Sequence, residues 1–270
     1  MILIGERING TYKDIGRAVK NRNPEPIRDW ASRQVAQGAD YLDLNVGTLA
    51  DNPAGAMKWL TLTVREITDC PFCFDSPNPD VIRAGLETGG PGSIINSCSA
   101  ERAKIETLFP VAREFGARII GLTMNERGIP RDAGSRAALA MELVAAADEF
   151  GLAADDLFID PLLLPVGVAQ EHAAEALKTI AAVRMLSSPP PRTVVGLSNI
   201  SQKTFDRSLI NRTFVVMAMA LGLDAAILDL CDDSLLDAIA TARILLNQEI
   251  YADSYLRLSR SRRQPDQRLS

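Results

Sequence analysis

The sequence is poor in the side chains that metal, redox and acid–base sites most often use, with one histidine and four cysteines among 270 residues. Because histidine is the usual general acid or base near neutral pH, a histidine-based mechanism is not expected. The one histidine, His172, stands in the helical stretch Gln170-Glu171-His172, and we expect it to be solvated. Four cysteines are also too few for a disulfide framework in a chain of this length.

Two of the cysteines, Cys70 and Cys73, have the Cys-x-x-Cys spacing of redox pairs and zinc sites. A redox pair normally opens a helix, and a zinc site needs two further ligands. Cys73 lies inside a strand pattern and no second cysteine pair follows, so packing in the core is the favoured interpretation. Cys98 and Cys231 each follow an expected strand end, and we expect them at the rim of the sheet, without a base that would make a catalytic thiol.

Long apolar segments and an excess of positive charge are also missing. The longest uncharged apolar stretch, 213–223, is shorter than the roughly 20 residues of a membrane-spanning helix. A formal net charge of −5, without a basic stripe interleaved with aromatic residues, argues against a nucleic-acid partner. The chain opens on a strand-like segment rather than on a secretory signal, so we expect a cytoplasmic protein that does not enter membranes.

The sequence does contain eight short apolar segments, and most of them end in a carboxylate or an amide. The segments are Ile2–Ile4, Tyr41–Asn45, Phe72–Asp75, Ser93–Asn96, Ile119–Asn125, Leu157–Asp160, Thr193–Asn199 and Ala225–Asp229. Helical stretches between them indicate βα units on a parallel sheet. Eight such units in about 250 residues predict one closed (β/α)₈ TIM barrel over residues 1–256, followed by a frayed, Arg-rich tail over 257–270.

Several helices have recognisable ends. Helices are expected over Pro24–Gln37 and over Ala137–Phe150. A further helix is expected to reach Phe115, with Ser99 as its N-cap. Asp232 or Asp233 should cap the last helix, and Pro189-Pro190-Pro191 should end the helix before the seventh strand. In a TIM barrel the carboxyl ends of the strands form one rim, which carries the active site.

A rim that carries Asp75, Asn96, Asp160 and Asn199 suits a planar heterocycle. A carboxylate accepts two parallel hydrogen bonds from an amino group beside a ring N–H. An amide both donates and accepts, which fits a ring edge that alternates the two functions, as in the pterin of a folate. A hard cation held by the Asp and Asn oxygens is the alternative, but hydrogen bonding explains these strand ends equally well without a metal.

The chain resembles, along nearly its whole length, the methyltetrahydrofolate:corrinoid methyltransferases, which bind a pterin in a barrel related to dihydropteroate synthase. The resemblance rests on the order and position of several motifs, none of which is decisive alone. The motifs are Gly5-Glu6-Arg7-Ile8-Asn9-Gly10, Leu42-Asp43-Leu44-Asn45-Val46-Gly47, Asp75-Ser76, Ile95-Asn96-Ser97, Gly121-Leu122-Thr123-Met124-Asn125, Ile159-Asp160-Pro161, Gly196-Leu197-Ser198-Asn199, Asn211-Arg212-Thr213-Phe214 and Gly222-Leu223-Asp224-Ala225-Ala226.

The resemblance implies a role for each matching residue. Asp75, Asn96 and Asp160 would bind the pterin, and Asn199 would lie near N5 as the catalytic amide. The residues expected to shape the pterin wall and to pack on the ring are Gly196, Ser198, Gln202 and Ile227. The residues expected to support the ligand or its neighbours are Glu6 and Asn9 after the first strand, and Asp43, Asn45 and Asn125. Apart from the resemblance, Lys203, Arg207 and Arg212 are candidates to meet the glutamate tail of the folate, with plain solvation as the alternative for exposed cations.

The resemblance also implies the reaction and its partners. The substrate would be methyltetrahydrofolate or tetrahydrofolate, and the methyl group would move between N5 and the cobalt of a corrinoid carried by a partner protein. Asn199 would hydrogen-bond at N5 and favour its protonated form, with the proton arriving through water. No bound metal is expected, and a homodimer is expected through the helical outside of the barrel near 214–223.

Two alternatives remain open at this point. A dihydropteroate synthase must bind a pyrophosphate leaving group and typically carries a basic Ser-Arg-Lys type of turn after a late strand. The corresponding turn here, Ser198-Asn199-Ile200, has no cations, which counts against that reaction. The other alternative is a folate-binding module without turnover, against which the intact set of site residues argues.

Overall fold

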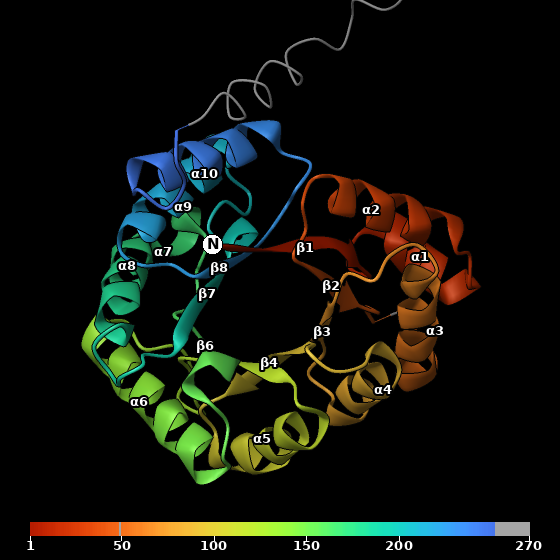
Figure 1. Cartoon of the computed structure of the whole chain (residues 1–270), viewed down its shortest axis with the longest axis horizontal. Helices are drawn as coiled ribbons and strands as arrows, with labels where there is room; N and C mark the ends of the chain where they lie inside the picture. Colours follow the sequence, from red (N-terminus) through yellow and green to blue (C-terminus); the bar gives the residue numbers. More distant parts are fainter. Residues whose placement is uncertain (49, 252–270) are drawn as a thin grey trace, which may run out of the picture.

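The computed structural model describes residues 1–48 and 50–251, which form a ring of strands surrounded by helices (Figure 1). Every strand pairs in parallel with the next along the chain, and β8 pairs with β1, so the sheet closes. The strands are β1 (Ile2–Asn9), β2 (Tyr41–Asn45), β3 (Phe72–Asp75), β4 (Ile94–Ser99), β5 (Arg118–Leu122), β6 (Leu157–Asp160), β7 (Arg192–Gly196) and β8 (Ala225–Leu228). The predicted (β/α)₈ barrel is therefore confirmed, and the predicted tail lies outside the described residues.

The helices cover the outer surface of the barrel, as Figure 1 shows. They are α1 (Lys13–Asn21), α2 (Glu25–Ala36), α3 (Pro53–Arg65), α4 (Pro79–Gly89), α5 (Arg102–Phe115), α6 (Ala133–Glu149), α7 (Val166–Ala169), α8 (Glu171–Val183), α9 (Arg207–Ala220) and α10 (Asp233–Leu245), with 3₁₀ turns η1 (Ala154–Asp156) and η2 (Leu197–Asn199). Among residues 1–48 and 50–251, no helix combines the length and apolar character that crossing a bilayer requires.

The inside of the barrel is closed by a layer to which every strand contributes one side chain. This floor layer consists of Ile4, Tyr41, Cys73, Ile94, Ile120, Phe158, Val194 and Ala225. All of its members are buried, and Cys73 among them confirms the core packing predicted for that cysteine. Because side chains alternate between the two faces of a strand, the residue two positions further along each strand must also point inward, just above the floor.

The outward-facing residues of the strands pack against the helices. Leu42, Leu44, Phe72 and Phe74 belong to one such buried cluster, and Val195 belongs to a second. Asp232 caps α10 as predicted, because its side chain accepts a hydrogen bond from the backbone N–H of Leu235. These clusters hold the helices on the barrel and leave its carboxyl-terminal end for the polar residues.

The first strand is longer than predicted, so that Glu6 and Asn9 lie within β1 rather than after it. The pairing of β1 with β2 shifts register between Gly5 and Ile8, which places a bulge at Glu6 and Arg7. Gln34 of α2 fills the space beside Gly5, where an added Cβ would lie 2.4 Å from Gln34 Oε1. The glycine therefore lets α2 approach the bulge, and Gln34 Oε1 accepts the backbone N–H of Arg7 (3.0 Å).

Three further predictions about local structure were wrong. Ser99 is the last residue of β4 rather than an N-cap, and Glu101 precedes α5 in the N-cap position. Cys98 lies inside β4 and is fully buried, so it does not reach the rim. His172 is 7% exposed rather than solvated, because its ring packs against the buried guanidinium of Arg136.

Candidate functional site

The residues that follow the floor layer by two positions form a second layer, and all of them line one cavity. This site layer consists of Glu6, Asp43, Asp75, Asn96, Leu122, Asp160, Gly196 and Ile227, one from each strand in order. Strand alternation accounts for both layers pointing into the barrel, and the polar residues at the strand ends make the site layer polar. The four acidic side chains and one amide of this layer thus meet at the carboxyl-terminal end of the barrel.

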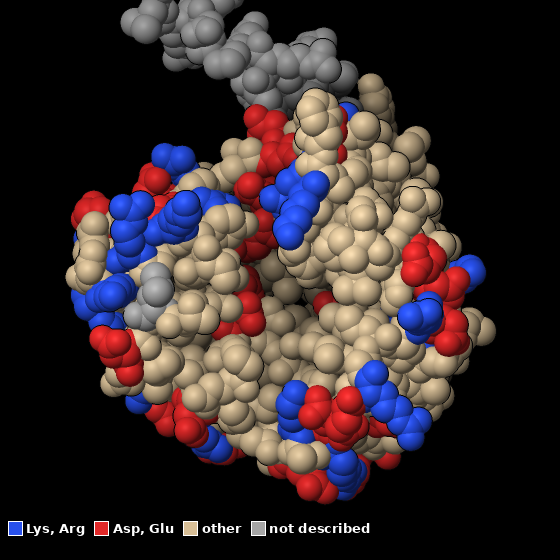
Figure 2. Space-filling view, turned by 180° about the vertical axis from the view of Figure 1, so that it is seen from behind, with Lys and Arg blue, Asp and Glu red and all other residues tan. Residues whose placement is uncertain are grey.

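The cavity has a volume of about 480 Å³ and opens on the face shown in Figure 2, where acidic side chains are visible inside a central hollow. Residues outside the site layer complete its wall. They are Asn9 of β1, Ser97 of β4, the loop residues Thr11, Tyr12, Leu162 and Gln202, Ser198 and Asn199 of η2, and Arg207 at the start of α9. The size is within the range of ordinary small-molecule sites.

Asp75 and Asp43 face the cavity from neighbouring strands, and each is held by an amide. Asn45 Nδ2 donates to Asp75 Oδ2 (2.8 Å), and Asn96 Nδ2 donates to Asp43 Oδ1 (3.1 Å). Burial raises the pKa of Asp43 well above its usual range, and the nearby Asp75 carboxylate is the second cause. Burial also raises the pKa of Asp75. Asp43 hydrogen-bonds to the thiol of Cys73 as well, so it is turned toward the floor of the site.

Asp160, at the end of β6, is a buried carboxyl group whose environment favours its neutral form. Burial raises the pKa of Asp160 to about 7, while the backbone N–H of Leu162 and the charge of Arg136 act in the opposite direction. The Leu162 N–H donates to Asp160 Oδ1 (2.7 Å). The residue is 8% exposed and lines the cavity. An amino group and a ring N–H presented together would satisfy it.

Asn199 ends the 3₁₀ turn η2 directly after β7, and its side chain is oriented by two neighbours. Gln202 Nε2 donates to Asn199 Oδ1 (3.0 Å). The Asn199 Nδ2 atom lies over Gly196, where an added Cβ would come within 2.9 Å of it. Since the amide oxygen is occupied by Gln202, the NH₂ group is the part of Asn199 that is left to donate to a ligand.

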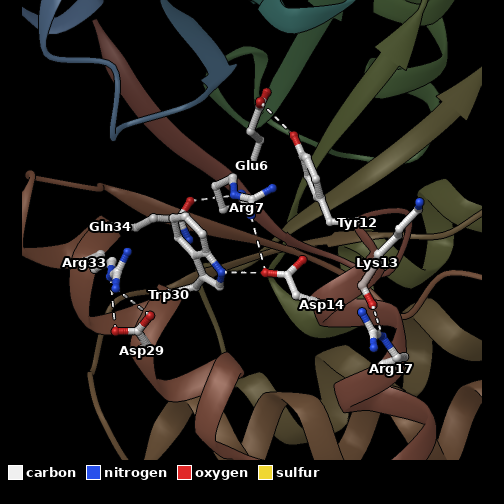
Figure 3. Close-up of polar contacts among 10 residues, drawn as sticks. All are labelled: Glu6, Arg7, Tyr12, Lys13, Asp14, Arg17, Asp29, Trp30, Arg33 and Gln34. Atoms are coloured by element: carbon white, nitrogen blue, oxygen red, sulfur yellow. Dashed lines mark hydrogen bonds and ion pairs between the residues drawn. The ribbon is translucent and has the colours of Figure 1, made fainter.

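Glu6 reaches the cavity from the β1 bulge and is bound by two hydroxyl groups. Ser198 Oγ (2.8 Å) and Tyr12 Oη (3.2 Å) both donate to Glu6 Oε1. Figure 3 shows Tyr12 with its ring against the guanidinium of Arg7, whose other face lies against Trp30. Burial raises the pKa of Glu6, and the hydrogen bond from Ser198 is the largest opposing influence.

The structure brings most of the predicted site residues together, but not all of them. Asn45 is adjacent to the cavity through Asp75, and its Oδ1 accepts the backbone N–H of Gly47 (2.6 Å). Asn125 does not line this cavity; it pairs with Gly128 and closes a turn after β5. The exposed Cys231 is likewise not among the residues that line the cavity.

Several residues that line the cavity were not predicted from the sequence as site residues. The inward position of Leu122 could have been predicted, because it follows the floor residue Ile120 by two positions on the same strand. Thr11, Tyr12 and Leu162 lie in loops, where no strand periodicity marks the side that faces the cavity. Only the packing of the loops over the barrel end places them at the site.

Chemically, the cavity presents carboxyl groups that can accept hydrogen bonds together with amide groups that can donate them. Within residues 1–48 and 50–251, no group of three or more His, Cys, Asp or Glu side chains is placed to hold a metal ion. The carboxyl groups of Asp75 and Asp160 with the amide of Asn96 suit a planar ring edge rich in N–H groups. Glu6 and Asn199 stand together beside Ser198, which gives that part of the cavity both a titratable group and a fixed donor.

Comparison with protein families and solved structures relates the chain to pterin-binding proteins. The model of the family described as "Pterin binding enzyme" matches residues 5–229. In fold, the chain is similar to dihydropteroate synthase from Xanthomonas albilineans in complex with 7,8-dihydropteroate, with a TM-score of 0.61 over 91% of this chain and 92% of that one. The sequences of the two are 15% identical, so this likeness bears on the fold alone.

Among curated proteins, the chain is similar to a methylcorrinoid:tetrahydrofolate methyltransferase from Eubacterium limosum, with 28% identity over 257 residues, which is 94% of each chain. It is also similar to the methionine synthases of Mycobacterium leprae (strain TN) and Mycobacterium tuberculosis (strain ATCC 25618 / H37Rv). Each of these two matches has 29% identity over 239 residues, covering 84% of this chain but 20% of the methionine synthase.

Proposed function

Because this chain belongs to the pterin binding enzyme family, we propose that it transfers a methyl group between N5 of methyltetrahydrofolate and the cobalt of a corrinoid held by a partner protein. The observation that carries the proposal is the meeting of Asp75, Asn96, Asp160 and Asn199 in one cavity. The similarity to the Eubacterium limosum methyltransferase over 94% of both chains supports this reaction over others of the family.

The pterin would bind through its donor-rich edge. Asp75 is anchored by Asn45 and Asp160 by the Leu162 N–H, so each carboxyl group is fixed before the ligand arrives. A ring that presents an amino group and a ring N–H replaces the water that these groups otherwise bind. Gly196 and Ile227 would form the walls beside the ring, where the glycine leaves room for the Asn199 amide.

Asn199 would act at N5. A methyl group on a tertiary amine leaves readily only when the nitrogen carries a proton or accepts a strong hydrogen bond as its lone pair is restored. The amide cannot give up a proton, but its NH₂ group is preorganised by Gln202. A donor that is fixed in advance stabilises the charge that develops in the transition state without the cost of reorienting solvent.

The other reactant would come from outside the barrel. The cavity opens at the end of the barrel, and Figure 2 shows the hollow unobstructed by described residues. Reduced cobalt carried on a partner protein could therefore approach the methyl group from solvent, in line with the bond that breaks. Holding donor and acceptor in line supplies much of the rate through orientation. The corrinoid protein and the folate are thus the proposed partners.

A direct assay tests the proposal. The protein is mixed with methyltetrahydrofolate and free reduced cobalamin, and formation of methylcobalamin is followed spectroscopically. Transfer well above the uncatalysed rate supports the proposal. Tight folate binding without transfer would favour a binding module, and condensation of a pterin pyrophosphate with 4-aminobenzoate would favour dihydropteroate synthesis.

A further inference from the structure

The proposed methyl transfer needs a proton at N5, and one carboxyl group of the cavity is bound differently from the rest. Asp75 accepts a hydrogen bond from the Asn45 amide, and Asp160 accepts one from the backbone N–H of Leu162. Both carboxyl groups are proposed to bind the edge of the pterin. Asp43 is turned toward Asn96 and the Cys73 thiol below the cavity. The hydrogen bonds to Glu6, by contrast, come from the hydroxyl groups of Ser198 and Tyr12.

We propose that Glu6 is the general acid that protonates N5 of the folate and that Tyr12 is its positioning residue. The inference rests on the proposed function and deepens it. Both hydrogen bonds converge on Glu6 Oε1, so neither hydroxyl engages Oε2. Ser198, which bonds to Glu6, is followed directly in the chain by Asn199, and both Glu6 and Asn199 line the cavity.

The proton balance of the step is simple. In the forward direction the Glu6 carboxyl O–H bond breaks and the proton passes to N5, directly or through one water. Reduced Co(I) then attacks the methyl carbon, the C–N5 bond breaks, and its electron pair stays on N5 beside the new N–H bond. Cobalt becomes methyl-Co(III), and the Glu6 carboxylate regains a proton from solvent. In the reverse direction the carboxylate removes the proton from N5.

The position of Tyr12 is fixed by a stack that begins at the same bulge of β1 as Glu6. The Arg7 guanidinium lies 3.8 Å from the centre of the Tyr12 ring and 4.0 Å from that of Trp30 (Figure 3). Asp14 holds Trp30 and Arg7 in place. Its carboxylate accepts a hydrogen bond from Trp30 Nε1 (2.9 Å) and lies 3.5 Å from Arg7 Nη2. The stack holds the Tyr12 hydroxyl against Glu6 and does not depend on a ligand.

The groups around Glu6 shift its pKa in both directions. Burial raises the pKa of Glu6 most, and the Asp229 carboxylate beyond β8 raises it further. The hydroxyls of Ser198 and Tyr12 and the charge of Arg207 at the start of α9 lower the same pKa. A raised pKa favours the protonated form of Glu6, which is the form that a general acid requires.

The test compares pH profiles of single-turnover methyl transfer to free reduced cobalamin for four proteins, with folate affinity measured beside each rate. Glu6→Gln keeps the shape of the side chain but carries no acidic proton. Tyr12→Phe keeps the ring on Arg7 and removes only the hydroxyl. Glu142→Gln, an exposed glutamate of α6, is the matched control beside the wild type.

The wild-type rate should fall as the pH rises through the pKa of Glu6. Glu6→Gln should lose this dependence and be slower by about 10²–10⁴-fold at acidic pH, with folate affinity changed far less. Tyr12→Phe removes a donor to the charged form, so the midpoint of its profile should move to higher pH. If Glu6→Gln does not fold, the Tyr12→Phe midpoint decides the question. An unchanged Glu6→Gln profile, or an unmoved Tyr12→Phe midpoint, overturns this inference. A wild-type protein without transfer overturns the proposed function itself.

Discussion

At the scale of single residues, each polar group of the site is oriented by a neighbour before any ligand binds. Gln202 orients Asn199, Asn45 orients Asp75, and the backbone of Leu162 orients Asp160. A group that is oriented in advance can contribute more to the rate of methyl transfer than to folate affinity, or the reverse. The predictions for single residues follow from that difference.

Asn199→Ala should lower kcat far more than it weakens folate binding. Loss of one preorganised donor typically costs about 10²–10³ in rate. Stopped-flow rates of cobalt methylation, measured beside a binding constant, check this, and Asn21→Ala, an exposed amide of α1, is the control. Equal losses in rate and affinity would reduce Asn199 to a binding residue.

Asp160→Ala should weaken folate binding severely while the fold is retained. The change leaves two pterin donors without an acceptor in a buried place, and each unsatisfied donor costs about 1–3 kcal/mol. Isothermal titration with methyltetrahydrofolate measures the effect, with Asp148→Ala on the exposed side of α6 as the control. An affinity equal to that of the wild type would remove Asp160 from the pterin edge.

The raised pKa of Asp160 also predicts how stability without ligand depends on pH. In the folded protein this pKa is about 7, above the unfolded value of about 3.9. The folded state therefore binds the extra proton between these values, and stability falls as the pH rises through that window. Asp160→Asn removes the charge, so this variant should be more stable than the wild type at pH 8 by about 1–2 kcal/mol. Each pKa unit corresponds to about 1.4 kcal/mol, and solvent in the cavity reduces the full effect.

Urea unfolding of the ligand-free proteins at pH 5 and pH 8 measures this effect. The advantage of Asp160→Asn should shrink at pH 5, where the wild-type carboxyl group is already neutral in the folded state. A constant difference between the two proteins across this range would show that Asp160 stays charged in the empty cavity.

At the scale of elements, close packing between strands and helices sets the position of the site layer. Two glycines of α4, Gly85 and Gly89, lie directly over the ring of Phe74 on β3. The helix can therefore pack close to the strand that carries Asp75. A side chain at either position would push the helix from the barrel.

Gly85→Ala should destabilise the protein, although alanine is the better helix former. The propensity gain is at most about 1 kcal/mol. The new Cβ would lie 2.6 Å from Phe74 Cδ1, and overpacking in a core typically costs about 1–3 kcal/mol, so the clash prevails. Thermal unfolding of Gly85→Ala beside Gly167→Ala, where nothing lies within 4 Å of an added Cβ, is the measurement. Equal unfolding temperatures for the two variants would show that α4 can move away at little cost.

At the scale of the whole molecule, an apolar groove lies between α8 and α9 on the outside of the barrel, away from the cavity. The residues that line it are Gln170, Ala173, Ala174, Leu177, Ile200, Leu209, Ile210, Thr213, Phe214 and Met217. Met217 is 50% exposed and Leu209 is 46% exposed on the same helix. Exposed apolar side chains gathered on one face are typical of interaction surfaces.

We expect this groove to be covered in a homodimer that leaves both cavities open. Of the segment that the sequence singled out as an interface, 214–223, Phe214 and Met217 line this groove, and the helix itself runs over Arg207–Ala220. Light scattering at micromolar concentration should give the mass of a dimer for the wild type, and Met217→Glu should lower it because a charge would be buried at the interface. A wild-type mass equal to that of one chain would refute the dimer.

The sequence by itself determined the barrel and most of its site. The polar residue at the end of each apolar segment, together with the order of parallel βα units, was enough to place Asp75, Asn96 and Asp160 at the same rim. These features are local and repeat in every βα unit, so that they can be read without knowing how the units pack. The resemblance carried by the motifs then indicated a pterin as the ligand.

The tertiary structure decided what depends on contacts between distant segments. Ser198 and Glu6 are 192 positions apart, and only closure of β8 onto β1 brings their side chains together. The burial of His172 against Arg136, and the stack that holds Tyr12, likewise come from helices and loops packing over the barrel. Burial sets the pKa values of the site carboxyl groups, and burial is a property of the closed barrel rather than of any segment.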